Sequence, residues 1–154
     1  MTARRVVIGV GNEYRRDDGF GPRVLAELAT RRDRDHRLAG VELRVSDGEP
    51  ARLLDAWAGA ELAVLVDVAA GGGEPGGWSE LALPETSGRH VTSGHDVALG
   101  DSVALARALD RLPARLVVLV AHGEEFGFGV GLSAAVAAVV RPVTDRVCEL
   151  VTAS

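Results

Sequence analysis

Short apolar or alternating runs follow one another along this chain, separated by segments whose apolar residues recur at helical spacing. The strand-like runs occupy residues 4–11, 41–48, 61–70, 78–83 and 114–121. The helix-like segments occupy residues 20–28, 49–60, 97–112 and 133–150, and Pro142 is expected to kink the last one. Continuous apolar runs are typical of strands buried on both faces of a parallel sheet. The alternation predicts an α/β fold, a three-layer α/β/α sandwich with a mainly parallel central sheet of about five strands.

Composition narrows the class of protein further. The 154 residues, 47% hydrophobic and only 4% aromatic, suit a single domain spanning residues 1–154 with an aliphatic core. A formal net charge of -5 with scattered arginines offers no basic stripe, so no nucleic-acid partner is expected. No apolar stretch approaches the ~20 residues that span a bilayer, so no membrane insertion is expected. We expect a soluble cytoplasmic monomer whose one cysteine, Cys148, is a small core residue.

The segment "GVGNEYRRDDGFGPRVLAEL", residues 9–28, begins like a nucleotide-binding glycine loop but does not continue as one. The dinucleotide fingerprint needs a small residue at its sixth position, where this chain has Tyr14. The Gly-Lys-Ser/Thr sequence of a Walker loop is absent as well. Asp17 and Asp18 stand where a phosphate would sit, and carboxylates repel phosphate. Residues 9–28 are therefore expected to bind a cation and not a phosphate.

Three potential metal ligands follow the predicted strands. In open parallel sheets, ligands gather at the carboxyl ends of the strands. Asp18 precedes the helix at 20–28, Asp67 is expected at the end of the strand within 61–70, and His95 precedes the helix at 97–112. Two carboxylates and one imidazole suit nickel, zinc, cobalt or cadmium, and three protein ligands leave coordination positions open. We therefore expect these three residues to form a metal site.

Each of these residues also has a purely structural interpretation. Asp17 or Asp18 can cap the helix that follows and favour its positive end. Asp67 can accept hydrogen bonds from turn amides, as aspartates after strands often do. His95 can be a surface loop residue. Only the combination of the residues favours a functional site.

The motifs, taken in order, resemble those of the hydrogenase maturation endopeptidases, which remove a C-terminal extension from the large subunit of nickel-iron hydrogenases. Residues 9–28 resemble the family's G-x-G-N-x-x-x-x-D-D/E-G-x-G opening, and residues 64–76 its D-A-x-x-x-G-x-x-P-G segment. Residues 92–109 resemble its S-x-H-x-x-x-L-x-x-x-L-x-L-A segment, and residues 129–136 its G-x-G-L-S-x-x-V segment. Residues 47–55 resemble the family's glycine-containing turn. The resemblance spans nearly the whole chain.

The resemblance implies an endopeptidase that acts after nickel insertion and recognises the nickel through Asp18, Asp67 and His95. The partner would be a nickel-iron hydrogenase large-subunit precursor, which supplies the nickel itself, and zinc or cadmium can replace it in vitro. The catalytic set would comprise these three residues together with Asp17, the nearest candidate for a helper base.

The loop after the last predicted strand, "AHGEEFGFGVGLS", departs from the family's pattern. It lacks the proline-containing segment common in relatives and is expected to help select the substrate. His122 is interpreted as a solvated loop residue, with a competing metal ligand as the alternative, and Trp57 as a core or partner-facing aromatic. Two other classes of function remain open, namely a non-catalytic nickel-binding maturation chaperone and a nucleotide-binding regulatory domain.

Overall fold

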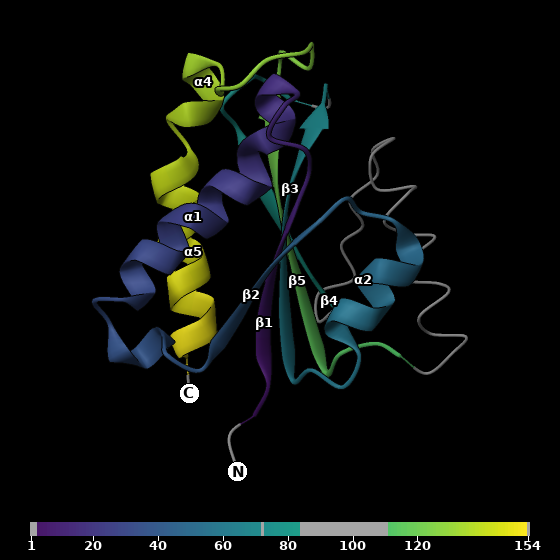
Figure 1. The fold of residues 1–154 in the computed structure, drawn as a ribbon, viewed down its shortest axis with the longest axis vertical. Helices are drawn as coiled ribbons and strands as arrows, with labels where there is room; N and C mark the ends of the chain where they lie inside the picture. Colours follow the sequence, from purple (N-terminus) through teal and green to yellow (C-terminus); the bar gives the residue numbers. More distant parts are fainter. Residues whose placement is uncertain (1–2, 72, 84–110, 154) are drawn as a thin grey trace.

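The computed structural model describes residues 3–71, 73–83 and 111–153 (Figure 1). The helix expected at 97–112 and the candidate ligand His95 lie outside these residues, and so does His90. Within the described part of the chain, no helix is both long enough and apolar enough to cross a membrane.

A five-stranded sheet forms the centre of the molecule, as the sequence predicts. Its strands are β1 (Arg5–Val10), β2 (Val41–Ser46), β3 (Leu62–Ala70), β4 (Trp78–Leu83) and β5 (Arg115–Gly123), in the spatial order β2-β1-β3-β5-β4. All neighbouring strands are parallel except β4, which runs antiparallel to β5 at one edge. The strands β3 and β5 are apolar along almost their whole length because helices and loops cover both of their faces.

Helices cover both faces of the sheet (Figure 1). On one face lie α1 (Phe20–Arg32) and α5 (Val140–Thr152), and on the other lies α2 (Pro50–Trp57). Two short 3-10 helices, η1 (Arg16–Gly19) and η2 (His36–Leu38), flank α1, and α4 (Ala134–Ala137) precedes α5. Each face has its own aliphatic core, and Trp57 is fully buried in the core under α2. The α/β/α sandwich is therefore confirmed.

The last helical segment differs from the expectation of one kinked helix. It forms two helices, α4 and α5, which meet at residues 138 and 139. Pro142 lies in the first turn of α5, where its missing N–H costs no helical hydrogen bond. The proline therefore helps to begin a helix, and the expected kink within a continuous helix is wrong.

Glycines allow the backbone of α1 to rest directly on the central strands. A Cβ atom at Gly21 would lie 2.6 Å from the backbone N and O atoms of Val10 and 2.7 Å from the O atom of Val66. A Cβ atom at Gly9 in β1 would likewise lie 2.6 Å from the O atom of Gly21. Any side chain at either position would push the helix away from the sheet. The contact holds the residues just before α1 at the carboxyl ends of β1 and β3.

We expect Gly21→Ala to destabilise the protein by about 2 kcal/mol or more, because overpacking against backbone atoms cannot relax easily. Helix propensity alone predicts the opposite sign, since alanine in a helix is about 1 kcal/mol better than glycine. Urea unfolding measures the difference. The control is Gly127→Ala, where a Cβ atom would meet nothing within 4 Å and stability should barely change. A Gly21→Ala protein as stable as the wild type would contradict the close packing.

Candidate functional site

The connections that leave the carboxyl ends of β1 and β3 run toward opposite edges of the sheet. From β1 the chain passes through α1 to β2 on one side, and from β3 it continues to β4 and β5 on the other. In open α/β sheets, ligands bind in the crevice at such a point, because the two connections leave in opposite directions, and we refer to this region as the crevice. Asp17 and Asp18 come to it on η1, which contacts β3, and Asp67 comes to it on β3 itself.

Asp18 is held against the turn that follows β1. Its Oδ2 atom accepts a hydrogen bond of 2.9 Å from the backbone N–H of Asn12. Gly11, with φ +141, packs so tightly on Asp18 that a Cβ atom there would lie 1.9 Å from the Asp18 carbonyl oxygen. The motif glycine is required both by its backbone conformation and by this approach. Asp18 is half-buried, so its carboxylate stays within reach of the crevice.

The sequence suggested that Asp67 ends a strand. In the structure Asp67 lies inside β3. The pairing of β3 with β1 stops at Val66, opposite Gly9, whereas its pairing with β5 continues to Ala70. The expected strand end is therefore wrong, because β5 extends the ladder further than β1 does. Asp67 is half-buried, and its Oδ1 atom accepts a hydrogen bond of 2.8 Å from the Val68 N–H, which is a strand amide. It stands just beyond the last β1 pair.

The carboxylate of Asp17 points away from that of Asp18, into the protein. Its Oδ2 atom accepts hydrogen bonds of 2.9 Å from the N–H groups of Glu124 and Glu125 and from the Ser133 hydroxyl. Its Oδ1 atom accepts one of 2.7 Å from the Ser133 N–H. The side chain is fully buried. Both oxygens are therefore engaged inside the protein, which weighs against the predicted role of Asp17 as a helper base.

The acidity of Asp17 follows from these contacts. Burial by itself raises the pKa of the carboxyl group, but the hydrogen bonds from three backbone amides and one hydroxyl outweigh it and hold the pKa below its ordinary value of 3.8.

Helix capping does not explain why two aspartates precede α1. The N-cap position of α1 is occupied by Gly19, so the capping interpretation of Asp17 and Asp18 is wrong.

The glycine turn after β1 is unsuited to a phosphate. In a phosphate-binding loop the backbone N–H groups point at the ligand. Here the N–H of Gly11 donates to the Ser46 carbonyl oxygen, that of Asn12 to Asp18, and that of Tyr14 to the Asn12 side chain. These three N–H groups are already bonded within the protein. The Asp18 carboxylate accepts from the Asn12 N–H, as a phosphate oxygen would.

Two of the three predicted metal ligands, Asp18 and Asp67, thus lie on elements that are in contact, η1 and β3. Within the described residues no three histidine, cysteine, aspartate or glutamate side chains come close enough to hold a metal ion, and His95 lies outside them. The donor chemistry of Asp18 and Asp67 fits a divalent cation of hard or borderline character. The assignment of Asp18, Asp67 and His95 as metal ligands therefore stays a prediction.

His122 belongs to β5 and is not a loop residue, so the solvated-loop interpretation is wrong. It is half-buried, and its Nδ1 atom is buried without a hydrogen-bond partner among the described residues. A Cβ atom at Gly73 would lie 2.8 Å from the imidazole Nε2 atom, so the ring packs against the segment after β3. The register places His122 on the same sheet face as Asp67. Its alternative role as a competing metal ligand stays a prediction.

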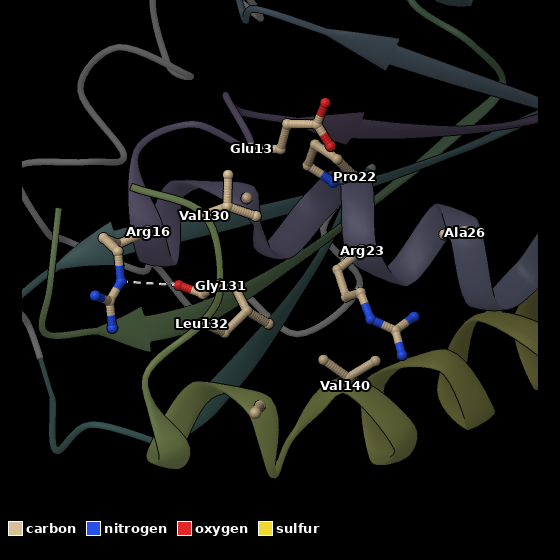
Figure 2. Close-up of a pocket in the computed structure, with 11 residues that line it drawn as sticks. Glu13, Arg16, Pro22, Arg23, Ala26, Val130, Gly131, Leu132 and Val140 are labelled. Atoms are coloured by element: carbon tan, nitrogen blue, oxygen red, sulfur yellow. Dashed lines mark hydrogen bonds between the residues drawn. The ribbon is translucent and has the colours of Figure 1, made fainter. Parts of the chain in front are cut away.

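A cavity of about 340 Å³ opens beside this region, between α1 and the segment that leads into α4 (Figure 2). Pro22, Arg23, Val130, Leu132 and Val140 line it. None of Asp17, Asp18 and Asp67 is among the described residues of its wall. The acidic crevice and this mainly apolar cavity are therefore separate features.

Ser133 is the residue that sequence reasoning missed. It lies in the segment "GVGLSAAV", which carries part of the family resemblance, but no local pattern links it to a residue near the start of the chain. Its partnership with Asp17 spans 116 positions in sequence. The sequence offered one indirect signal for this pairing. The motifs at residues 9–28 and 129–136 both follow predicted strands, and the second had no assigned role.

The lowered pKa of Asp17 predicts a specific pH dependence of stability. A carboxyl group whose pKa falls on folding stabilises the protein above its unfolded pKa, near 3.8, and this contribution is lost as the pH drops through the folded value. Asp17→Asn should cost about 1–3 kcal/mol at neutral pH, because a buried donor loses its acceptor. Urea unfolding from neutral pH down to about pH 3 should show the gap to the wild type closing only below pH 3.8. A gap that stays constant over this range would contradict the assignment.

Comparison with known proteins identifies other structures with this fold. No protein-family model matches the sequence, and no curated protein sequence matches it either. Solved structures do match. The hydrogenase maturating endopeptidase HybD from E. coli has a TM-score of 0.73 at 22% identity, covering 94% of this chain and 89% of its own. The NiFe hydrogenase maturation protease HybD from Thermococcus kodakarensis has a TM-score of 0.71 at 23% identity, covering 96% and 99%. A hydrogenase 2 maturation peptidase from a Thaumarchaeota archaeon has a TM-score of 0.68 at 25% identity, covering 96% and 97%. The chain therefore has the fold of the hydrogenase maturation endopeptidases, the family that its motifs resemble.

Proposed function

We propose that this protein is an endopeptidase that removes the C-terminal extension of a nickel-iron hydrogenase large-subunit precursor after nickel insertion. The observation that carries the proposal is the pair of half-buried carboxylates, Asp18 and Asp67, at the point where the sheet connections diverge. Known hydrogenase maturation proteases share this fold.

The nickel belongs to the substrate in this proposal. Asp18 and Asp67, together with His95 from outside the described residues, bind the nickel that the precursor already carries. A partial ligand set suits a metal whose remaining ligands come from another protein. Binding holds the adjacent peptide at the crevice, so that only a precursor with its metal inserted is positioned for cleavage.

Hydrolysis then adds a water molecule across one peptide bond near the bound metal. The half-buried carboxylates orient the segment that bears the metal, and positioning of this kind lowers the barrier by removing the entropy cost of encounter. Both oxygens of Asp17 accept hydrogen bonds within the protein, so the proposal gives Asp17 no part in proton transfer.

The decisive experiment incubates the purified protein with nickel-loaded and nickel-free large-subunit precursor and measures the mass of the product. We expect a shortened product from the nickel-loaded precursor only. Stable binding without shortening would favour the nickel-binding maturation chaperone. A rise in melting temperature with nucleotides but not with nickel would favour the nucleotide-binding regulatory domain.

Asp18→Asn should abolish processing and weaken nickel binding by more than ~100-fold, since it removes a charged ligand from a small set. Stability should change by less than about 0.5 kcal/mol, because the amide oxygen of the new side chain still accepts from the Asn12 N–H. Calorimetric nickel titration, melting temperature and precursor processing measure the three effects.

The matched control for that variant is Asp33→Asn, which removes an exposed carboxylate at the other end of α1. It should process the precursor and bind nickel like the wild type. Normal processing by Asp18→Asn would refute the assignment of that residue as a ligand.

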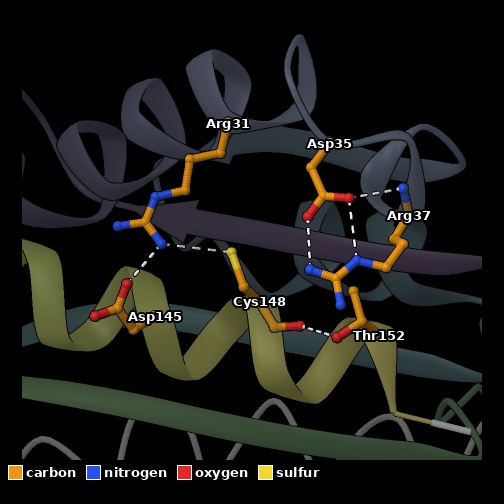
Figure 3. A network of polar contacts seen from close by, with 6 residues as sticks. All are labelled: Arg31, Asp35, Arg37, Asp145, Cys148 and Thr152. Atoms are coloured by element: carbon orange, nitrogen blue, oxygen red, sulfur yellow. Dashed lines mark hydrogen bonds and ion pairs between the residues drawn. The ribbon is translucent and has the colours of Figure 1, made fainter.

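Cys148 lies in a polar network between α1 and α5 (Figure 3). Its sulfur atom is 3.8 Å from the Arg31 guanidinium, which also forms an ion pair of 2.6 Å with Asp145. The thiol is half-buried, and this burial raises its pKa despite the neighbouring guanidinium. The sulfur is therefore a poor nucleophile at neutral pH.

We expect Cys148→Ser to process the precursor at a rate within about 2-fold of the wild type, and thiol alkylation to leave processing intact, because no step needs a thiolate. Processing rates before and after alkylation provide the measurement. Complete loss of activity in a folded Cys148→Ser protein would indicate a cysteine mechanism instead.

A further inference from the structure

The buried carboxylate of Asp17 joins two segments that lie far apart in the sequence. Its partners Glu124, Glu125 and Ser133 are 107 to 116 positions away and belong to the loop between β5 and α4. We refer to residues 124–133 as the 124–133 loop. Four hydrogen bonds from this loop end on one carboxylate, which is fully buried, and Ser133 is 6% exposed. Charged acceptors form the stronger class of hydrogen bond, so Asp17 is the main attachment point of the loop.

The backbone around Asp17 reinforces this attachment. The Asp17 N–H donates to the Glu125 carbonyl oxygen at 2.8 Å, and the Arg16 N–H donates to that of Gly129 at 3.0 Å. The Gly129 N–H donates in turn to the Tyr14 carbonyl oxygen at 2.9 Å. Residues 14–17 and the 124–133 loop therefore form one hydrogen-bonded unit.

The side chain of Arg16 crosses the same junction. Its Nε atom donates to the Gly131 carbonyl oxygen at 2.9 Å, and its Nη2 atom pairs with Glu125 at 2.8 Å. Figure 2 shows the bond from Arg16 to Gly131. Arg16 has φ +51, a left-handed conformation that is costly for a residue with a side chain. The surrounding contacts hold it in this conformation.

This unit carries exposed apolar side chains close in sequence to Asp17 or to its loop partners. Phe128 is 96% exposed, Val130 73% and Tyr14 62%, and they are three of the four large apolar side chains that are exposed among the described residues. Gly129 bonds to Tyr14, and Asp18 follows Tyr14 within the same short segment. The exposed side chains are thereby joined, through residues 14–17, to the segment that carries Asp18.

We propose that Asp17 is a positioning residue, which fixes the 124–133 loop beside Asp18 so that its exposed apolar side chains contact the metal-bearing precursor. The identity of that partner rests on the proposed function, whereas the attachment of the loop by Asp17 does not. Asp17 acts through the loop and does not touch the reacting peptide.

The chemistry of asparagine makes Asp17→Asn a direct test. The carboxylate accepts from three backbone N–H groups and one hydroxyl, whereas an asparagine amide has one acceptor oxygen and an NH₂ group that only donates. At least one loop N–H must then face another donor. Ser133→Ala is the milder partner variant, because it removes only the hydroxyl bond and leaves the carboxylate in place.

Hydrogen exchange measured by mass spectrometry on the proteins without precursor tests the attachment. We expect exchange in the 124–133 loop to be at least about 10-fold faster in Asp17→Asn, with a smaller increase in Ser133→Ala. Unchanged exchange in the loop of a folded Asp17→Asn protein would overturn the proposal. If Asp17→Asn does not fold, Ser133→Ala decides. Faster exchange confined to the loop supports the proposal, and an increase spread over the whole chain overturns it.

Steady-state kinetics with nickel-loaded precursor test the consequence. A loosened loop should raise KM by about 10-fold and change kcat by less than about 3-fold, and Phe128→Ser should show the same pattern without faster exchange. A fall in kcat of about 100-fold at unchanged KM would place Asp17 in the chemical step and overturn the positioning role.

The two experiments separate this proposal from the proposed function. If the wild-type protein does not shorten the nickel-loaded precursor, the proposed function fails, and hydrogen exchange still decides whether Asp17 holds the loop. If the wild type shortens the precursor but the exchange of the Asp17→Asn loop is unchanged, only the positioning role fails.

Discussion

The site depends on the close contact between the start of α1 and the ends of the two central strands. Gly21 lies so near the backbone of Val10 and Val66 that no side chain fits between them. This contact fixes where η1 must lie, because η1 leads directly into α1. Two consecutive aspartates on η1 are thereby placed at the crevice between β1 and β3, where α/β proteins bind their ligands.

The two aspartates have opposite surroundings although they are neighbours in the chain. Asp17 points toward the side of the sheet covered by α1 and α5, and a Cβ atom at Gly123 would lie only 3.2 Å from the Asp17 Cβ atom. Asp18 points toward the turn at Asn12 and stays half-buried at the crevice. Four donors within the protein offset the cost of burying the Asp17 carboxylate. The same chemical group thus has different surroundings at two consecutive positions.

Several elements could be predicted from the sequence because their signals are local. The apolar runs of β3 and β5, the amphipathic pattern of α1 and the glycine turn after β1 all depend on residues within a few positions of one another. Predictions failed where a distant partner decided the outcome. Asp67 lies within a strand because β5 extends the ladder, and His122 lies in β5 because β3 and β4 pair with its end. The capping role expected for the aspartates failed because Gly19 occupies the N-cap of α1.

The sequence by itself determined the α/β architecture and the glycines that allow the tight turn after β1. These features follow from periodicity, backbone freedom and residue chemistry, which act over short stretches of chain. Only the tertiary structure decided that Asp17 turns inward to bind a loop 107 to 116 positions away. That outcome depends on packing α1 against β1 and β3 while β5 ends beside them. Hydrogen bonds between distant segments form only after the sheet order has brought their backbones together.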